Sequence, residues 1–126
     1  MLTSLPFAPI MNCMETLDLS SALEMLGGEK ELLIELLKSF VSGNRLNKGE
    51  LERLEALPDK TEAAKYVHFY KGAARQLAAQ KLAASGQSLE DVLRGKKDGD
   101  LKALNEAFLA DYDEAFEAIT GSLEVL

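Results

Sequence analysis

Apolar side chains recur at helical spacing along most of the chain, and this periodicity restricts the fold more than any other feature of the sequence. In one short and four longer segments, apolar residues return after three, four or seven positions, which places them on one face of an α-helix. Leu, Ala, Glu and Lys dominate the 126 residues and Trp is absent, a composition that favours helices over strands. We therefore predict an all-α fold.

The residues that begin and end helices divide this pattern into five elements. Asp18 is expected to cap a short first helix that ends before Gly27, and Gly95 ends a later one. The predicted ranges are 19–26, 29–57, 60–77, 79–94 and 100–120 or beyond. Gly43 and Gly49 each weaken the helix over 29–57 by up to about 1 kcal/mol, so a kink or break between them is left open. An antiparallel four-helix bundle with a short extra N-terminal helix would bury all these stripes together.

The chain length fits one domain. Residues 1–15 contain two prolines and no periodicity, which predicts an irregular N-terminal arm followed by one four-helix domain over 16–126. No apolar run reaches the roughly 20 residues of a membrane span, and the first residues lack the basic start of a signal peptide. A single cysteine, Cys13, excludes an intrachain disulfide. We expect a cytoplasmic monomer, because no long apolar stripe is left without a partner.

Charge and motif content exclude several classes of function. With 21 acidic and 14 basic residues the net charge is −7, which repels nucleic acid and anionic lipid, so neither is an expected partner. A carboxylate-bridged metal site in a bundle needs Glu-x-x-His pairs on two helices, but the chain has one histidine, and Lys65 stands three residues before it. No G-x-S-x-G turn is present either. We expect no metal site and no hydrolase triad.

The single histidine, His68, lies within the helical segment TEAAKYVHFYKGAARQL. Helical spacing divides this segment into an apolar face with Ala63, Val67, Tyr70, Ala74 and Leu77, and an opposite face with Ala64, Lys65, His68, Lys71, Gly72 and Arg75. Because the apolar face packs, the imidazole is predicted to face solvent. An ordinary imidazole is largely neutral near pH 7, and its unprotonated nitrogen is a nucleophile toward a phosphoryl group.

Positive charge and a glycine surround the histidine on the same predicted face. Lys71 follows one turn later, where its ammonium can reach the oxygens of a phosphoryl group. Lys65 and Arg75 add positive charge, although surface pairs with acids such as Glu62 explain them equally well. Gly72 costs helix stability unless something approaches the backbone closely. That neighbour is either a phosphoryl group or docking partner, or a closely packed helix.

These residues carry a resemblance to a known family. HFYKGAARQLAAQKL is similar to the H-x-x-K-G-A-A motif of histidine-containing phosphotransfer (HPt) domains, and Leu89 with Glu90 resembles the Leu-Glu pair of that family's next helix. The resemblance covers about residues 17–120. Val67 stands where Ala is frequent, Tyr70 replaces a usual aliphatic residue, and Ala78 stands where a Gly often follows the helix. The resemblance implies a four-helix bundle with a role in a phosphorelay.

The same resemblance implies roles for individual residues. His68 would accept the phosphoryl group through Nε2, Lys71 would neutralise the phosphoryl oxygens, and Gly72 would leave space beside the imidazole. Glu90, or else Gln87, would accept a hydrogen bond from Nδ1–H and fix the tautomer. Taken alone, Glu90 is more simply explained as a solvated helix residue, and the case for Gln87 is weaker still. The expected supporting or docking residues are Ala64, Lys65, Arg75, Gln87 and Glu90.

The implied partners are a response-regulator receiver domain and a sensor or hybrid histidine kinase. The chain would be a phospho-carrier without ATP-dependent kinase activity of its own and without a cofactor, and the receiver would supply Mg²⁺. A histidine-kinase dimerisation helix also bears a phosphoacceptor, but similar proteins place an acid directly after it, where Phe69 stands here. The competing hypothesis is a phosphorylation-inactive helical adaptor that binds signalling proteins through the same face.

Overall fold

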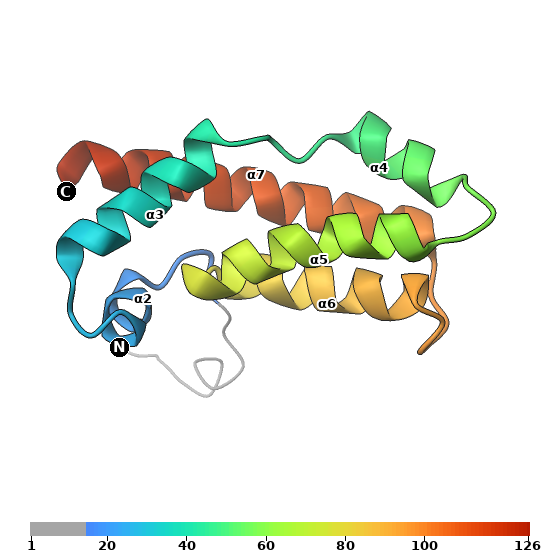
Figure 1. Cartoon of the computed structure of the whole chain (residues 1–126), viewed down its shortest axis with the longest axis horizontal. Helices are drawn as coiled ribbons and strands as arrows, with labels where there is room; N and C mark the ends of the chain where they lie inside the picture. The colour runs from blue at the N-terminus through green and yellow to red at the C-terminus, as the bar shows by residue number, and fades with distance from the viewer. Residues whose placement is uncertain (1–14) are drawn as a thin grey trace, which may run out of the picture.

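The computed structural model describes residues 15–126, and this part of the chain is all-α, as the sequence predicts. The helices are α2 (Leu19–Met25), α3 (Lys30–Ser42), α4 (Lys48–Glu55), α5 (Thr61–Gln76), α6 (Gln80–Leu93) and α7 (Leu101–Val125) (Figure 1). Asp18 caps α2 as predicted, because its carboxylate accepts a hydrogen bond from the backbone N–H of Ser21. The predicted arm over 1–15 falls outside the described residues except for Glu15.

The helices form a bundle whose members run in alternating directions. α5, α6 and α7 lie side by side. α3 and α4 are placed end to end and together form the fourth member of the bundle (Figure 1). The short α2 packs against α3 at one end of the bundle. This arrangement agrees with the predicted antiparallel four-helix bundle with a short extra N-terminal helix.

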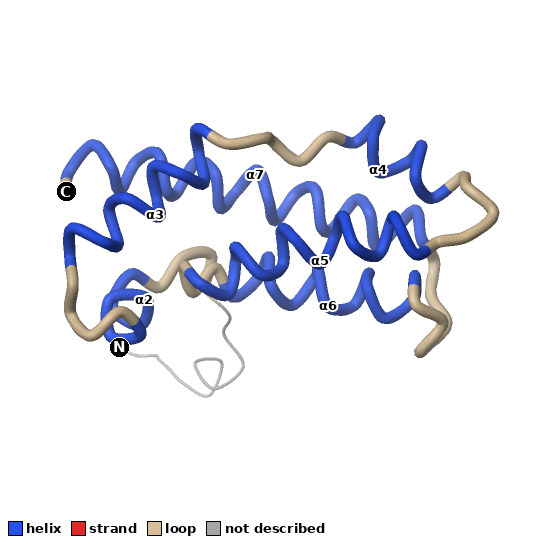
Figure 2. The backbone as a smooth tube through the Cα atoms, viewed as in Figure 1, coloured by secondary structure: helices blue, strands red, loops and turns tan. Residues whose placement is uncertain are grey.

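The single helix predicted over 29–57 is wrong. The segment forms α3 and α4, which a loop over residues 43–47 separates (Figure 2). Asn47 begins α4, because its side chain accepts a hydrogen bond from the backbone N–H of Glu50 at 2.8 Å. The hydroxyl of Tyr70 donates to the carbonyl of Asn44 at 2.9 Å. The Asn47 cap and the hydrogen bond from Tyr70 replace some of the backbone hydrogen bonds that a continuous helix would form here. The break therefore falls between Gly43 and Gly49, where the sequence left a kink or break open.

Two contiguous clusters of buried side chains form the core. The larger one is centred on α5, α6 and α7 and includes the completely buried Leu82, Leu89 and Phe108. The smaller one includes Ala22, Leu37 and Ile119, where α2 and α3 meet the end of α7. The apolar face predicted for the histidine helix is buried at every position, namely Ala63, Val67, Tyr70, Ala74 and Leu77. Burial of this face leaves part of the opposite face of α5, including His68, at the surface.

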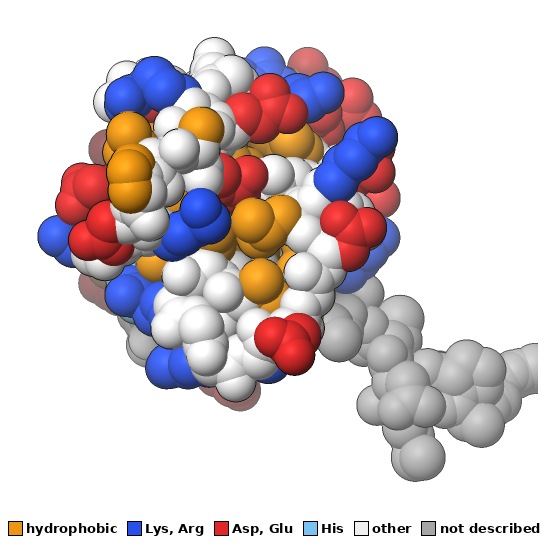
Figure 3. All heavy atoms as spheres, turned by 90° about the vertical axis from the view of Figure 1, so that its right-hand side faces the viewer, with side chains coloured by type: hydrophobic (Ala, Val, Ile, Leu, Met, Phe, Trp, Pro, Cys, Tyr) orange, Lys and Arg blue, Asp and Glu red, His pale blue; other side chains and the backbone are white. Residues whose placement is uncertain are grey.

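The surface carries charges of both signs. At the end of the bundle where α6 leads into α7, acidic and basic side chains are interspersed, with hydrophobic side chains between them (Figure 3). The excess of acidic residues in the sequence is therefore not gathered into a single patch on this face. Among the helices of residues 15–126, none combines the length and the apolar character needed to cross a membrane.

Candidate functional site

His68 lies in the middle of α5 with its imidazole turned toward solvent. Its side chain is 60% exposed, although Val67 directly before it is completely buried. The prediction that the imidazole faces solvent is therefore confirmed. α5 starts next to Asp59, whose carboxylate accepts hydrogen bonds from the backbone N–H and the hydroxyl of Thr61.

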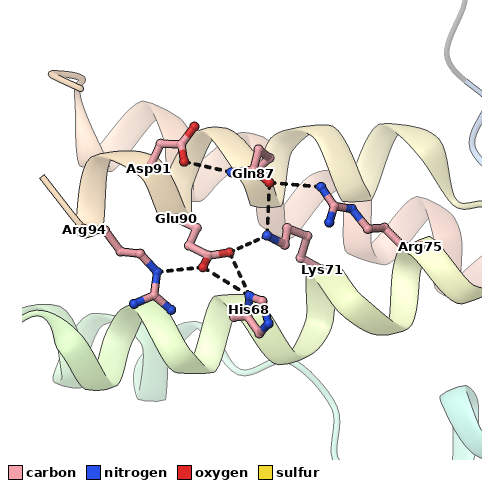
Figure 4. Close-up of polar contacts among 7 residues, drawn as sticks. All are labelled: His68, Lys71, Arg75, Gln87, Glu90, Asp91 and Arg94. Atoms are coloured by element: carbon pink, nitrogen blue, oxygen red, sulfur yellow. Dashed lines mark hydrogen bonds and ion pairs between the residues drawn. The ribbon is translucent and has the colours of Figure 1, made fainter. Parts of the chain in front are cut away.

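The carboxylate of Glu90 projects from α6 toward the imidazole (Figure 4). The Nδ1 atom of His68 lies 3.1 Å from Oε2 and 3.2 Å from Oε1 of Glu90, so the predicted contact is present. Burial raises the pKa of Glu90, but hydrogen bonds from Lys71, Arg94 and His68 more than offset burial and lower the pKa to about 2. An ionised carboxylate only accepts hydrogen bonds, so a neutral imidazole must carry its hydrogen on Nδ1. The lone pair then lies on Nε2.

Lys71 does not lie on the exposed face, and this prediction is wrong. Its side chain is only 6% exposed, and its ammonium donates to Oε1 of Glu90 at 2.7 Å and to Oε1 of Gln87 at 3.0 Å. Both acceptors come from α6, so a helical projection of α5 alone assigns this charged residue to solvent. The described contacts engage the ammonium in a buried ion pair beside the histidine.

The prediction that Ala64 belongs to a docking face is also wrong, because this residue is completely buried in the larger core cluster. An alanine fits either face of a helix, so its polarity carries little information about its orientation.

Of the two explanations that the sequence leaves open for Gly72, the structure argues against close helix packing. A Cβ atom at Gly72 would meet no described atom within 4 Å, so close helix packing does not explain this glycine. At Gly86 of α6, a Cβ atom would lie 3.1 Å from Cε1 of Phe108 and 3.2 Å from Cβ of Lys71. Gly86 therefore permits the close approach of α5, α6 and α7 beside Lys71, and the space next to Gly72 is open.

Three further predicted residues, Gln87, Arg75 and Lys65, form hydrogen bonds or ion pairs with residues other than His68. Gln87 accepts hydrogen bonds at 3.0 Å from Lys71 and at 3.0 Å from Arg75, so it is not the partner of Nδ1. Lys65 is exposed, and its Nζ atom lies 3.4 Å from Oε2 of Glu62, one turn earlier on α5. This is the surface ion pair that the sequence analysis gave as the alternative explanation of Lys65.

Two residues of the network were not identified from the sequence. Arg94 donates through Nε to Oε2 of Glu90 at 2.7 Å, and its side chain is one-third exposed. Asp91 accepts a hydrogen bond from Nε2 of Gln87 at 2.8 Å (Figure 4). Each lies four residues after its partner, a spacing at which side chains on a helix are neighbours, so this spacing was the available signal.

An apolar groove with a volume of about 470 Å³ lies beside the imidazole, between α3 and α5. Besides His68, its lining includes Leu36, Phe40, Phe69, Gly72, Leu77 and Tyr112. Phe69 is 67% exposed, a large apolar side chain in water next to the histidine. The site therefore combines a nucleophilic nitrogen, a polar network on the α6 side and an apolar surface on the α3 side.

Comparison with known proteins gives a match to a protein family. A protein-family model described as "Hpt domain" matches residues 35–123, more than half of the chain. No curated protein and no solved structure matches. The matched range runs from α3 into the last turns of α7 and contains His68 with its whole polar network.

Proposed function

Because this chain belongs to the Hpt domain family, whose members transfer phosphoryl groups in two-component systems, we propose that His68 is its phosphoacceptor. One observation supports this assignment above the others. The imidazole is 60% exposed, whereas the carboxylate that holds its Nδ1 atom is only 7% exposed. A buried anion thus orients an exposed ring, and His68 is the only histidine of the chain.

The proposed reaction is a reversible transfer between His68 and a receiver aspartyl phosphate. The Nε2 lone pair attacks the phosphorus, an N–P bond forms, and the P–O bond to the aspartate breaks and releases its carboxylate. The hydrogen on Nδ1 stays in place, and the positive charge that the ring acquires lies next to the ionised Glu90. The reverse reaction returns the phosphoryl group to an aspartate.

The cations around Glu90 would offset the charge of the bound phosphoryl group. Lys71, one turn after His68 on α5, and Arg94, at the end of α6, both donate to Glu90, at 2.7 Å each. A phosphoryl group on Nε2 adds negative charge to this cluster, and charge-assisted hydrogen bonds to phosphoryl oxygens are among the stronger ones in proteins. The receiver would bring Mg²⁺, so this chain acts as a carrier and provides no ATP site.

Docking would use the exposed part of α5 and the groove beside it. Lys65 and Arg75 are exposed on either side of His68, and Gly72 leaves open space next to the imidazole. The basic side chains would face the acidic pocket of a receiver, and the groove with Phe69 would take up apolar side chains. Sensor or hybrid histidine kinases and response-regulator receivers are the partners with which Hpt domains work.

The test is a transfer of labelled phosphoryl groups to the 126-residue chain from phosphorylated receivers of the same organism. We expect an acid-labile, base-stable label on the wild type and none on His68→Gln. Glu62→Gln is the matched control, because Glu62 is exposed one and a half turns earlier on α5. This control should label like the wild type, and circular dichroism should show that all three proteins are folded.

Two outcomes would contradict the proposal. Label that persists on His68→Gln would place the phosphoacceptor elsewhere. A wild type that binds receivers but takes no label from any of them would support the helical adaptor, which would use the same groove for protein binding alone.

A further inference from the structure

The amide of Gln87 lies between two cations and an acid on the side of the site away from the imidazole. Its Oε1 atom accepts hydrogen bonds from Lys71 and Arg75, at 3.0 Å each. Its Nε2 atom donates to Oδ1 of Asp91 at 2.8 Å (Figure 4). Asp91 lies one turn after Gln87 on α6 and is partly buried.

These partners allow only one orientation of the amide. The ammonium of Lys71 and the guanidinium of Arg75 can only donate hydrogen bonds, and the carboxylate of Asp91 can only accept them. If the amide turned over, its NH₂ group would face two cations and its oxygen would face a carboxylate. Asp91 thus keeps the amide oxygen directed toward Lys71.

We propose that Asp91 is a positioning residue for phosphotransfer, which acts on His68 through Gln87, Lys71 and Glu90. This inference rests on the proposed function of His68. The chain of contacts is continuous: Asp91 orients Gln87, Gln87 and Glu90 share the ammonium of Lys71, and Glu90 holds Nδ1 of the imidazole. Asp91 itself touches neither the ring nor the place where a phosphoryl group would bind.

The burial of Lys71 explains why the orientation of Gln87 matters. With 6% of its side chain exposed, the ammonium has little access to water and depends on Glu90 and Gln87 as acceptors. If Gln87 loses its fixed orientation, Lys71 loses one acceptor and is drawn toward other oxygens, so that Glu90 is held firmly by Arg94 alone at Oε2 and less firmly by Lys71 at Oε1. A carboxylate that moves allows the imidazole to rotate away from the geometry needed for attack.

The first measurement compares Asp91→Ala, Asp91→Asn and wild type in single-turnover transfer from a phosphorylated receiver. We expect Asp91→Ala to lower the rate at saturating receiver by about fivefold, which corresponds to about 1 kcal/mol. The receiver concentration at half-maximal rate should change less than the rate itself, because Asp91 reaches the docking residue Arg75 only through Gln87. Asp91→Asn keeps an oxygen for Nε2 of Gln87 and should recover most of the rate. Asp98→Ala, in the exposed turn after α6, removes the same charge and should transfer like the wild type.

A double-mutant cycle tests the route through Gln87. Asp91→Ala should have no further effect on the rate when it is added to Gln87→Leu, because the residue through which it acts is already absent. Equal fold-losses in the two backgrounds would overturn the route, and a rate for Asp91→Ala within twofold of the wild type would overturn the proposal. If the wild type itself takes no label, the proposed function fails instead, so the two failures are distinguishable.

Discussion

Glu55, the last residue of α4, has a buried carboxylate oxygen without a hydrogen-bond partner among the described residues, and its replacement tests what such an unpaired oxygen costs the fold. Nδ2 of Asn105 donates to Oε1 of Glu55 at 2.6 Å, but Oε2 of Glu55 and Oδ1 of Asn105 are buried and have no hydrogen-bond partner among the described residues. Glu55→Gln supplies an NH₂ group at this place. We expect the substitution to raise the free energy of unfolding at pH 7.5 by about 1–2 kcal/mol, within the cost of leaving a buried polar atom unpaired.

The gain in the free energy of unfolding from Glu55→Gln should increase with pH. Burial raises the pKa of Glu55, the nearby charge of Glu52 adds to this, and the hydrogen bond from Asn105 and the charge of Lys60 oppose it. The folded protein therefore binds this proton more tightly than the unfolded chain, so stability falls as the pH rises from the ordinary glutamate range through the raised pKa. Glutamine cannot ionise. The difference in stability between variant and wild type should be largest at pH 7.5 and smaller at pH 4.

The assay is thermal and urea unfolding of the two proteins at both pH values. A gain of about 1–2 kcal/mol corresponds to a rise in Tm of roughly 3–8 °C for a domain of this size. Glu52→Gln is the matched control, because it removes the same charge from an exposed position of the same helix, and it should change the stability by less than about 0.5 kcal/mol. A variant no more stable than the wild type at pH 7.5, or a gain equally large at pH 4, would refute the reasoning.

Three further predictions concern backbone strain, helix packing and the buried ion pair, all measured by urea unfolding. Ala78 has a φ of +55°, so Ala78→Val should destabilise the fold by about 2 kcal/mol or more, while Ala78→Gly should stay within about 1 kcal/mol of the wild type. Gly72→Ala should stabilise by up to about 1 kcal/mol, because the added Cβ meets open space, whereas Gly86→Leu should destabilise by about 1–3 kcal/mol; equal signs would contradict the packing described. Lys71→Met should destabilise by about 1–3 kcal/mol, because it leaves the buried Glu90 with one cation fewer, and an unchanged stability would show that the ion pair contributes nothing.

The parts of the fold that depend on local pattern could be predicted from the sequence. The histidine helix was expected over 60–77 and runs from Thr61 to Gln76, and the next was expected over 79–94 and runs from Gln80 to Leu93. Both have a continuous apolar stripe, which is the signal that a bundle requires of its members. The exposure of His68 followed from the same stripe, because the opposite face of α5 has to be buried.

The errors have a different physical origin, because each depends on contacts between helices. Lys71 is charged and was assigned to solvent, yet Glu90 and Gln87 on α6 supply the acceptors that make its burial favourable. The break between α3 and α4 is stabilised in part by a hydrogen bond from Tyr70 on α5 to Asn44. No pattern within a single helix contains these partners, so periodicity alone cannot predict them.

The site and the core share one structural requirement, which is a short distance between α5 and α6. Gly86 leaves room for Lys71 and Phe108 where a larger residue would push the helices apart, and Lys71 reaches Glu90 only across this narrow interface. Glu90 in turn reaches the imidazole across the same interface. We therefore expect substitutions at these residues to alter stability together with the proposed phosphotransfer. Gly72 lies on the open side of the helix, so we expect substitutions there to affect the proposed docking without a loss of stability.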